Sequence, residues 1–155
     1  MKNGAEAVST ILAVKGSRVV TIKPSDTITT LSERLREQRI GAAIVSSDGH
    51  TVEGVISERD LAYGLAEHKG DLHSMRVESL MTKTVITCSP QDSIANVAST
   101  MIARNVRHIP VVERERLVGM ISIRDVLNVR VDELQRQTSQ LRAFALEAER
   151  EPQDR

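Results

Sequence analysis

A serine, an arginine and an aspartate occur together twice in this chain, at a spacing that suits either structure or binding. Ser57, Arg59 and Asp60 form the first set, and the stretch Ser122 to Asp125 repeats it with Arg124 in the same place. A serine followed three residues later by an acidic residue is typical of a capping box, in which each side chain bonds the backbone N–H of the other residue. Such a cap stabilises a helix by about 1 kcal/mol without any ligand. Both sets therefore predict helix starts, and capping alone would explain the serines and aspartates.

The two arginines favour a second interpretation. Arg59 and Arg124 would lie in the first turn of a helix, where the helix dipole makes a cation unfavourable. A bound anion would remove that conflict, because helix N-termini and arginines both suit phosphate. The neighbouring carboxylate could accept hydrogen bonds from a ribose diol, and Gly54 and Gly119 would let a flat ring approach the backbone. Serine, arginine and aspartate together thus suggest a nucleoside phosphate.

An internal repeat supplies the elements that position these residues. Each copy is predicted to form a β-α-β-β-α unit of about 60 residues, with apolar helix positions on one face. The first copy has strands at Val19 to Ile22, Ala42 to Val45 and Val52 to Ile56, apolar helix positions at Ile28, Leu31 and Leu35, and a second helix from near Arg59. The second copy has strands at Val85 to Cys88, Ile109 to Val112 and Leu117 to Ile121, apolar helix positions at Ile94, Val97 and Met101, and a second helix from near Arg124. One unit has a small core, so we expect the two copies to pack by their sheets.

The repeat divides the chain into five parts. We expect a first repeat at residues 8–67, a linker at 68–76, a second repeat at 77–131, a helical extension at 132–149 and a tail at 150–155. Upstream of each unit, Val8 to Leu12 resembles Val77 to Met81. The extension carries an a/d seam at Val131, Leu134, Thr138, Leu141, Ala145 and Ala148. This seam would pack either on its own domain or on a second copy of the chain. We favour the dimer because the seam is longer than packing on one repeat requires.

Composition and charge argue against several classes of function. The 155 residues carry 21 Lys and Arg against 21 Asp and Glu, and this balance disfavours a nucleic-acid partner. No run of about 20 apolar residues is present, so no membrane partner is expected. The single cysteine, Cys88, excludes an intrachain disulfide and suits a reducing cytoplasm. No catalytic set and no convincing metal spacing stand out, so we predict neither an enzyme nor a metal site.

The two copies resemble a pair of cystathionine-β-synthase (CBS) domains, a tandem often called a Bateman module. The resemblance rests on Val106 to Val112 and Leu117 to Asp125 in the second copy, and on Thr21 to Asp26 and Gly54 to Asp60 in the first. It implies an α/β fold in which two β-α-β-β-α repeats pack sheet to sheet with pseudo-twofold symmetry, with a C-terminal helix in addition. In that family, the clefts between the repeats bind adenosine compounds: AMP, ADP, ATP, S-adenosylmethionine and, in some members, NAD(H).

The resemblance also implies roles for individual residues. It assigns the ribose to Ser57 with Asp60 and Ser122 with Asp125, the adenine to Val55 and Met120, the phosphate to Arg59, Arg107, His108 and Arg124, and the borders of the opposite clefts to Thr21 and Thr87. Gly41 and Ala42 stand where the second copy has Arg107 and His108, so we expect the two sites to differ in affinity or ligand. The small side chains at Gly41 and Ala42 would leave space for a dinucleotide.

The expected function is regulatory rather than catalytic. An adenine nucleotide would bind between the repeats and change their packing, and an unidentified effector protein would read that change. Members of the family commonly dimerise, so we expect a homodimer. The alternative is a ligand-independent structural dimerisation module, in which the serine–aspartate boxes are only caps. A third hypothesis is an enzyme subunit that converts a nucleotide.

Overall fold

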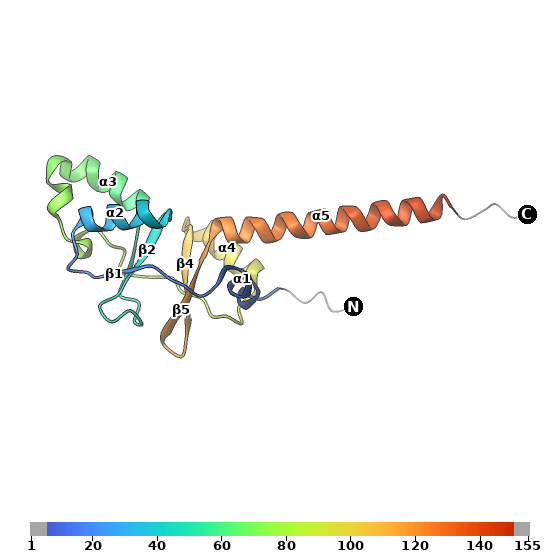
Figure 1. Ribbon diagram of the computed structural model, residues 1–155, viewed down its shortest axis with the longest axis horizontal. Helices are drawn as coiled ribbons and strands as arrows, with labels where there is room; N and C mark the ends of the chain where they lie inside the picture. The colour runs from blue at the N-terminus through green and yellow to red at the C-terminus, as the bar shows by residue number, and fades with distance from the viewer. Residues whose placement is uncertain (1–5, 151–155) are drawn as a thin grey trace, which may run out of the picture.

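The computed structural model describes residues 6–150 and shows two α/β units and a long C-terminal helix (Figure 1). The elements of the first unit are β1 (Thr21–Ile22), α2 (Ile28–Gln38), β2 (Ala42–Val45), β3 (Gly54–Ser57) and α3 (Glu58–His68). Helix α1 (Val8–Lys15) precedes them, and the 3-10 segments η1 (Lys69–Ser74) and η2 (Val77–Ser79) follow. The elements of the second unit are α4 (Ile94–Arg104), β4 (His108–Glu113), β5 (Arg116–Ser122) and α5 (Ile123–Ala148).

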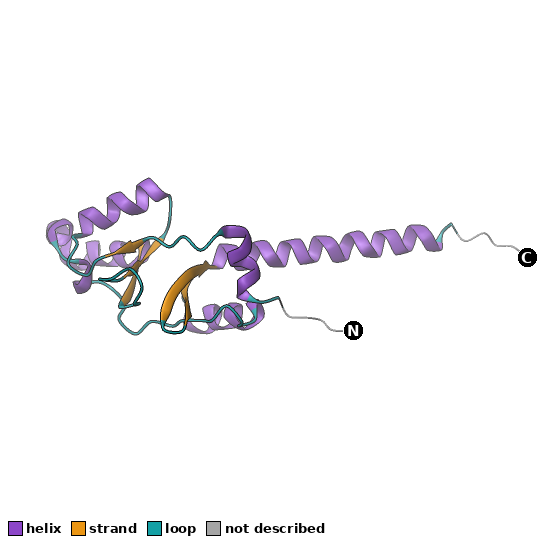
Figure 2. Ribbon diagram, turned by 60° about the horizontal axis from the view of Figure 1, so that its bottom comes forward, coloured by secondary structure: helices purple, strands orange, loops and turns teal. Residues whose placement is uncertain are grey.

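The two sheets lie in the middle of the body and the helices on its outer sides (Figure 2). The first sheet has the order β1-β2-β3, with β1 parallel and β3 antiparallel to β2. The second sheet pairs β4 and β5 antiparallel. A hydrogen bond between backbone groups joins the units at one end, where the Leu117 N–H donates to the His50 carbonyl at 2.8 Å. This arrangement confirms the predicted α/β fold of two repeats that face each other by their sheets.

The first strand of each copy is shorter than the sequence predicts. Instead of Val19 to Ile22, only Thr21–Ile22 pairs with β2. The expected strand at Val85 to Cys88 is wrong, because only Cys88 forms a bridge, parallel to Val111. The residues before Cys88 leave the sheet and run along the gap between the two units, where the functional site lies.

The first helix of each unit forms for the same local reasons. Side-chain oxygens at the N-cap accept backbone N–H bonds, from Thr30 to Thr27 at 3.2 Å and from Asn96 to Ser93 at 3.1 Å. Each helix ends at a residue with left-handed backbone, Arg39 in α2 and Asn105 in α4. The predicted apolar positions are the buried ones: Ile28, Leu31 and Leu35 in α2, and Ile94, Val97 and Met101 in α4.

The two hydrophobic cores exchange their upstream segments. Val8 and Ile11 of α1 pack in the core of the second unit, whereas Leu72 and Val77 pack in the core of the first. The exchange is fixed by backbone bonds: Val8 N–H donates to the Asp92 carbonyl at 2.9 Å, and Val77 N–H donates to the Asp26 carbonyl at 2.8 Å. The boundaries of the two repeats along the sequence stay a prediction. In space, α1 belongs to the core of the second unit.

Helix α5 begins in the body and then projects away from it (Figure 1). Its start at Ile123 and end at Ala148 confirm the predicted long helix. From Leu134 to Arg150 every residue is exposed. Within residues 6–150, no helix is both long enough and apolar enough to cross a lipid bilayer.

Candidate functional site

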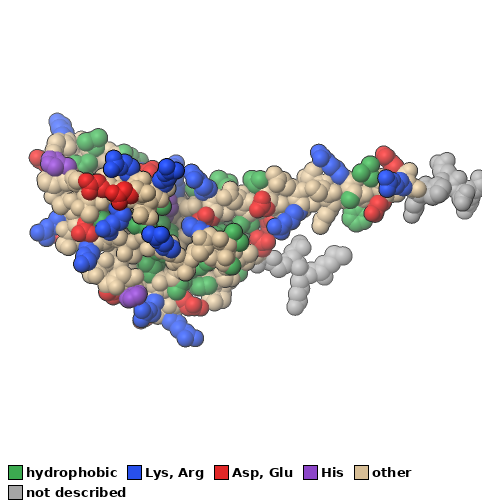
Figure 3. Space-filling model, in the orientation of Figure 1, with side chains coloured by type: hydrophobic (Ala, Val, Ile, Leu, Met, Phe, Trp, Pro, Cys, Tyr) green, Lys and Arg blue, Asp and Glu red, His purple; other side chains and the backbone are tan. Residues whose placement is uncertain are grey.

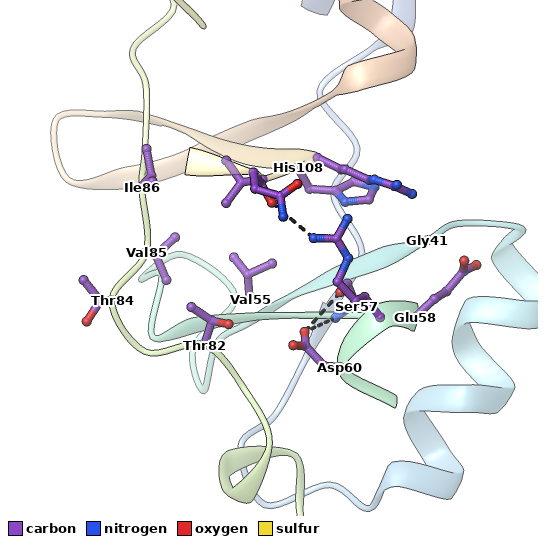
Figure 4. Close-up of a pocket in the computed structure, with 14 residues that line it drawn as sticks. Gly41, Val55, Ser57, Glu58, Asp60, Thr82, Thr84, Val85, Ile86 and His108 are labelled. Atoms are coloured by element: carbon purple, nitrogen blue, oxygen red, sulfur yellow. Dashed lines mark hydrogen bonds between the residues drawn. The ribbon is translucent and has the colours of Figure 1, made fainter. Parts of the chain in front are cut away.

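A cavity of about 250 Å³ lies between the two units (Figure 4). Its floor comes from the end of β3 and the start of α3, its far wall from the start of β4, and one side from the chain that leads to Cys88. The lining residues are Gly41, Val55, Ser57, Glu58, Arg59, Asp60, Thr82, Thr84, Val85, Ile86, Asn105, Val106, Arg107 and His108. The cavity thus collects seven of the predicted site residues, from both repeats.

Two acidic residues, Glu58 and Asp60, line this cavity, and capping bonds fix the carboxylate of Asp60. Ser57 and Asp60 form the predicted capping box at the start of α3. Asp60 Oδ2 accepts the Ser57 backbone N–H at 2.8 Å and the Ser57 hydroxyl at 3.1 Å. Among the described residues, none donates a hydrogen bond to Asp60 Oδ1. Capping therefore engages one oxygen of the carboxylate and leaves the other open to the cavity.

Basic side chains lie opposite this carboxylate. The Arg59 guanidinium crosses from α3 to the second unit, where it donates to the Asn105 carbonyl at 3.2 Å. Arg107 is exposed at the rim and His108 is half-buried beside Gly41. Burial is the main cause that lowers the pKa of His108, so the neutral imidazole is favoured. This side of the cavity can accommodate an anion.

The apolar part of the cavity was not fully predicted. Val55, Val85, Ile86 and Val106 line it, and only Val55 was expected. The sequence pattern suggested a strand from Val85 onward, in which the backbone groups would have been paired. Because that strand does not form, the stretch Thr84–Ile86 borders the cavity instead. The matching residues of the first repeat, 18–20, also lie outside a strand.

Seven predicted residues do not line this cavity, and three of them, Thr21, Ala42 and Thr87, lie away from the second capping box. Thr87 is exposed, one residue beyond Ile86. Thr21 lies in β1, where it is opposite Ile44 in register. Ala42 is fully buried in β2, next to Gly41.

The second set of predicted residues is arranged differently. Ser122 and Asp125 form the same capping box at the start of α5, with the Ser122 N–H donating to Asp125 Oδ2 at 2.8 Å. The same oxygen also accepts from the ammonium of Lys15 at 2.7 Å, and that ammonium donates to the Met120 carbonyl at 2.8 Å. Burial would raise the pKa of Asp125, but the bonds from Lys15 and Ser122 outweigh it and hold the pKa low. The exposed Arg124 follows Ile123 at this helix start.

Gly54 and Gly119 have a different role from the one expected. A Cβ on Gly54 would lie 2.7 Å from the sulfur of Met81, and a Cβ on Gly119 would lie 2.6 Å from Leu12 Cδ2. The space over each glycine is therefore filled by the exchanged upstream segment of the chain. The absence of a side chain at these glycines makes room for Met81 and Leu12, not for the flat ring of a ligand.

The CBS domain family matches residues 12–67 and 77–132 of this chain. The match covers both repeats and most of the sequence. The chain therefore belongs to the CBS-domain family, and it carries two CBS domains in tandem.

Solved structures agree with this assignment. A CBS-domain-containing protein from Agrobacterium tumefaciens is 35% identical, with a TM-score of 0.78 over 81% of this chain and 99% of that chain. A CBS domain protein from Pyrobaculum aerophilum, complexed with AMP, is 28% identical, with a TM-score of 0.69 over 77% and 89% of the two chains. The CBS domain pair of protein MJ0100, in complex with 5'-methylthioadenosine and S-adenosyl-L-methionine, is 25% identical, with a TM-score of 0.72 over 80% and 98%.

Curated relatives differ more in length. The chain spans 70%, 57% and 60% of three curated relatives, at 30%, 24% and 28% identity. Across residues 6–150, no three His, Cys, Asp or Glu side chains are grouped as metal ligands. Cys88 is buried, and burial raises its pKa to about 11, which does not suit a nucleophile.

Proposed function

We propose that the cavity between the two repeats binds an adenosine nucleotide, and that this protein is a regulatory module. The observation that carries the proposal is the Asp60 carboxylate, which faces a cavity bounded by basic groups and has one oxygen free of capping bonds. A ribose diol offers two donors to such a carboxylate. Relatives of the same fold bind AMP, 5'-methylthioadenosine and S-adenosyl-L-methionine, which share this ribose.

Each part of the nucleotide has a matching surface in the cavity. The adenine would lie between Val55 and the stretch Thr84–Ile86, whose backbone groups are outside any strand and can bond the edge of the base. The phosphate would lie at the start of α3, where backbone N–H groups and Arg59 favour an anion. Arg107 and His108 would approach it from the second repeat.

AMP, ADP and ATP are the primary candidate ligands, and NAD(H) is a further one. Gly41 supports the larger ligand, since a Cβ placed there would approach His108 Cε1 at 3.5 Å and Glu58 Cδ at 3.7 Å. The absence of a side chain at Gly41 therefore widens the cavity between these two groups. Gly41→Arg would fill this space, and we expect it to weaken NAD⁺ binding more than AMP binding.

A calorimetric titration tests the proposed site. Wild-type protein is titrated with AMP, ATP, NAD⁺, NADH and S-adenosylmethionine, after a mass check for carried-over ligand. Asp60→Asn keeps an oxygen that can accept the Ser57 N–H but removes the charge, so we expect at least tenfold weaker binding with the fold intact. Asp92→Asn is the matched control, because Asp92 Oδ2 accepts the Ser89 N–H at 2.8 Å in a turn outside the cavity. Equal affinities for wild type and Asp60→Asn would contradict the proposed site.

Binding between the repeats also supplies a signal. Arg59 of the first repeat is bonded to the Asn105 carbonyl of the second, and a phosphate at α3 would compete for that guanidinium. The nucleotide would thereby replace the Arg59–Asn105 hydrogen bond with its own contacts to both repeats. An effector protein would bind the two resulting arrangements of the repeats with different affinity. Hydrogen exchange with and without AMP should change at residues 82–86 and 105–108.

The second candidate function is assembly through α5. The projecting part of this helix is exposed on all sides, and an isolated helix of this length is marginal in water. Its apolar seam at Val131, Leu134, Thr138, Leu141, Ala145 and Ala148 suits a second helix of the same kind. A homodimer through α5 is compatible with nucleotide binding. If no nucleotide bound, dimerisation would be the protein's function by itself.

A further inference from the structure

We infer that Lys15 takes the place of a ligand at Asp125, the counterpart of Asp60 in the second repeat, so that the chain binds one nucleotide, at Asp60. The inference rests on the proposed function and deepens it, because it says which of the two repeated sites is available. It also assigns a role to α1, which packs in the core of the second unit.

The contacts of Lys15 are those that a polar ligand would make. Its ammonium lies 2.7 Å from Asp125 Oδ2 and 2.8 Å from the Met120 carbonyl oxygen. The Asp125 side chain is 17% exposed and that of Lys15 is 36% exposed, so the pair is partly shielded from water. At the equivalent position of the first repeat, the Asp60 carboxylate accepts hydrogen bonds from Ser57. Besides the serine N–H, Oδ2 of Asp125 thus accepts the Lys15 ammonium, whereas Oδ2 of Asp60 accepts the Ser57 hydroxyl.

The exchange of upstream segments explains how Lys15 reaches this position. Leu12 covers Gly119 as Met81 covers Gly54, which makes Leu12 and Met81 equivalent in the two halves. Three residues further along stand Lys15 and Thr84, and Thr84 lines the open cavity. Lys15 therefore reaches Asp125 from the place that corresponds to a cavity wall in the first repeat.

The fixed position of α1 makes Lys15 an effective competitor. Val8 N–H and Ser9 N–H donate to the carbonyls of Asp92 and Pro90, both at 2.9 Å, and these bonds hold α1 on the second unit. A tethered group acts at an effective concentration in the millimolar range. A nucleotide at Asp125 would have to break this pair and displace the Lys15 side chain, whereas a nucleotide at Asp60 would meet no such competitor.

Stoichiometry tests the inference, with AMP as the probe. Wild type, Lys15→Met, Lys15→Gln and Lys15→Met/Asp125→Asn are titrated by calorimetry, and circular dichroism verifies that each variant is folded. Lys23→Met is the matched control, since Lys23 is an exposed lysine in the first repeat. We expect one AMP for wild type and Lys23→Met, two for both single Lys15 variants, and one again for the double variant.

The outcomes separate this inference from the proposed function. Two AMP molecules on wild type, or one on both Lys15 variants, would overturn the inference and leave the proposed function standing. One AMP on wild type that is lost in Asp125→Asn and kept in Asp60→Asn would also overturn it. AMP binding by Lys15→Met with none by wild type would support the role of Lys15 and contradict the Asp60 site. No binding by any folded variant would overturn both.

Discussion

Asp60 and Asp125 occupy equivalent positions, yet their surroundings give the two carboxylates different chemistry. Each begins a helix with the serine three residues before it, and each accepts that serine's N–H at 2.8 Å. Only Asp125 also has an ammonium at 2.7 Å. A difference of one side chain, Lys15, therefore separates a carboxylate that can accept a ribose from one that is already paired.

The Lys15–Asp125 pair predicts a pH-dependent stability. The pKa of Asp125 is lower in the folded protein than in the unfolded chain, so the pair stabilises the fold above about pH 4 and loses this effect as pH falls through the folded pKa. Because Lys15 is partly exposed, we expect Lys15→Met to lower the free energy of unfolding by about 0.5–1 kcal/mol at pH 7. At pH 2.5 the difference should be smaller, because a larger fraction of Asp125 is protonated. Denaturant unfolding at both pH values measures it, and an equal difference at both would contradict the prediction.

His108 predicts a second pH effect, nearer to neutrality. Burial favours its neutral form, with Lys15 and Arg107 acting in the same direction and Glu58 and Asp125 opposing them. The folded pKa is thus below the unfolded value of about 6.5, and folding stability falls as pH drops below that value.

A substitution at His108 isolates this contribution. We expect ligand-free His108→Gln to lose less stability than wild type between pH 7.5 and pH 5.5, because glutamine does not titrate. Thermal unfolding of both proteins across this range measures the difference, with His50→Gln, at an exposed turn, as the control. Parallel curves for His108→Gln and wild type would show that His108 is not held neutral by the fold.

At the scale of elements, the exchanged segments fill the space above the two strand glycines. The Gly54 position is the tighter of the two, because a Cβ there would also lie 3.0 Å from the backbone carbonyl of Thr82. At Gly119 the near atoms all belong to the side chain of Leu12, which can rotate. We therefore expect Gly119 to tolerate a larger side chain better than Gly54, although the two glycines occupy equivalent positions in the repeats.

Alanine substitutions test this difference. We expect Gly54→Ala to destabilise the fold by about 1–3 kcal/mol, since backbone must move, and Gly119→Ala to cost less. Gly70→Ala is the control, because nothing lies within 4 Å of a Cβ there. Denaturant unfolding of the three variants gives the order, and a larger loss for Gly119→Ala than for Gly54→Ala would contradict it.

At the scale of the whole molecule, the shape itself points to a larger assembly. The body holds both repeats and the cavity between them, whereas the second half of α5 extends beyond it with apolar and charged side chains interspersed (Figure 3). Leu134, Leu141 and Phe144 are 63%, 71% and 71% exposed. Burying such side chains against a second copy would stabilise a helix that has no neighbour in its own chain.

A double substitution on the seam tests this assembly. We expect Leu134→Asp/Leu141→Asp to shift a wild-type dimer to monomer, because two charges would enter the a/d interface. Gln140→Asp/Ala143→Asp adds the same charges off the seam and should leave the dimer intact. Sedimentation velocity distinguishes the two states. A wild-type monomer at all concentrations, or a dimer that survives the seam variant, would contradict dimerisation through α5.

The sequence alone determined the elements whose cause is local. Capping residues, left-handed helix ends and apolar periodicity act within a few residues, so both amphipathic helices, the capping boxes at Ser57 and Ser122 and the long α5 were predictable. The internal repeat then indicated a pair of equivalent units, and the family resemblance gave their arrangement.

Only the tertiary structure decided how the repeats differ. The upstream segments that the two cores exchange are the α-helix α1 in one case and the 3-10 segment η2 in the other, and their placement depends on contacts between segments far apart in the sequence. The Lys15–Asp125 contact joins residues 110 positions apart in the sequence, and no local pattern encodes it. Repetition in sequence therefore predicted two similar sites, whereas packing left one carboxylate open and paired the other.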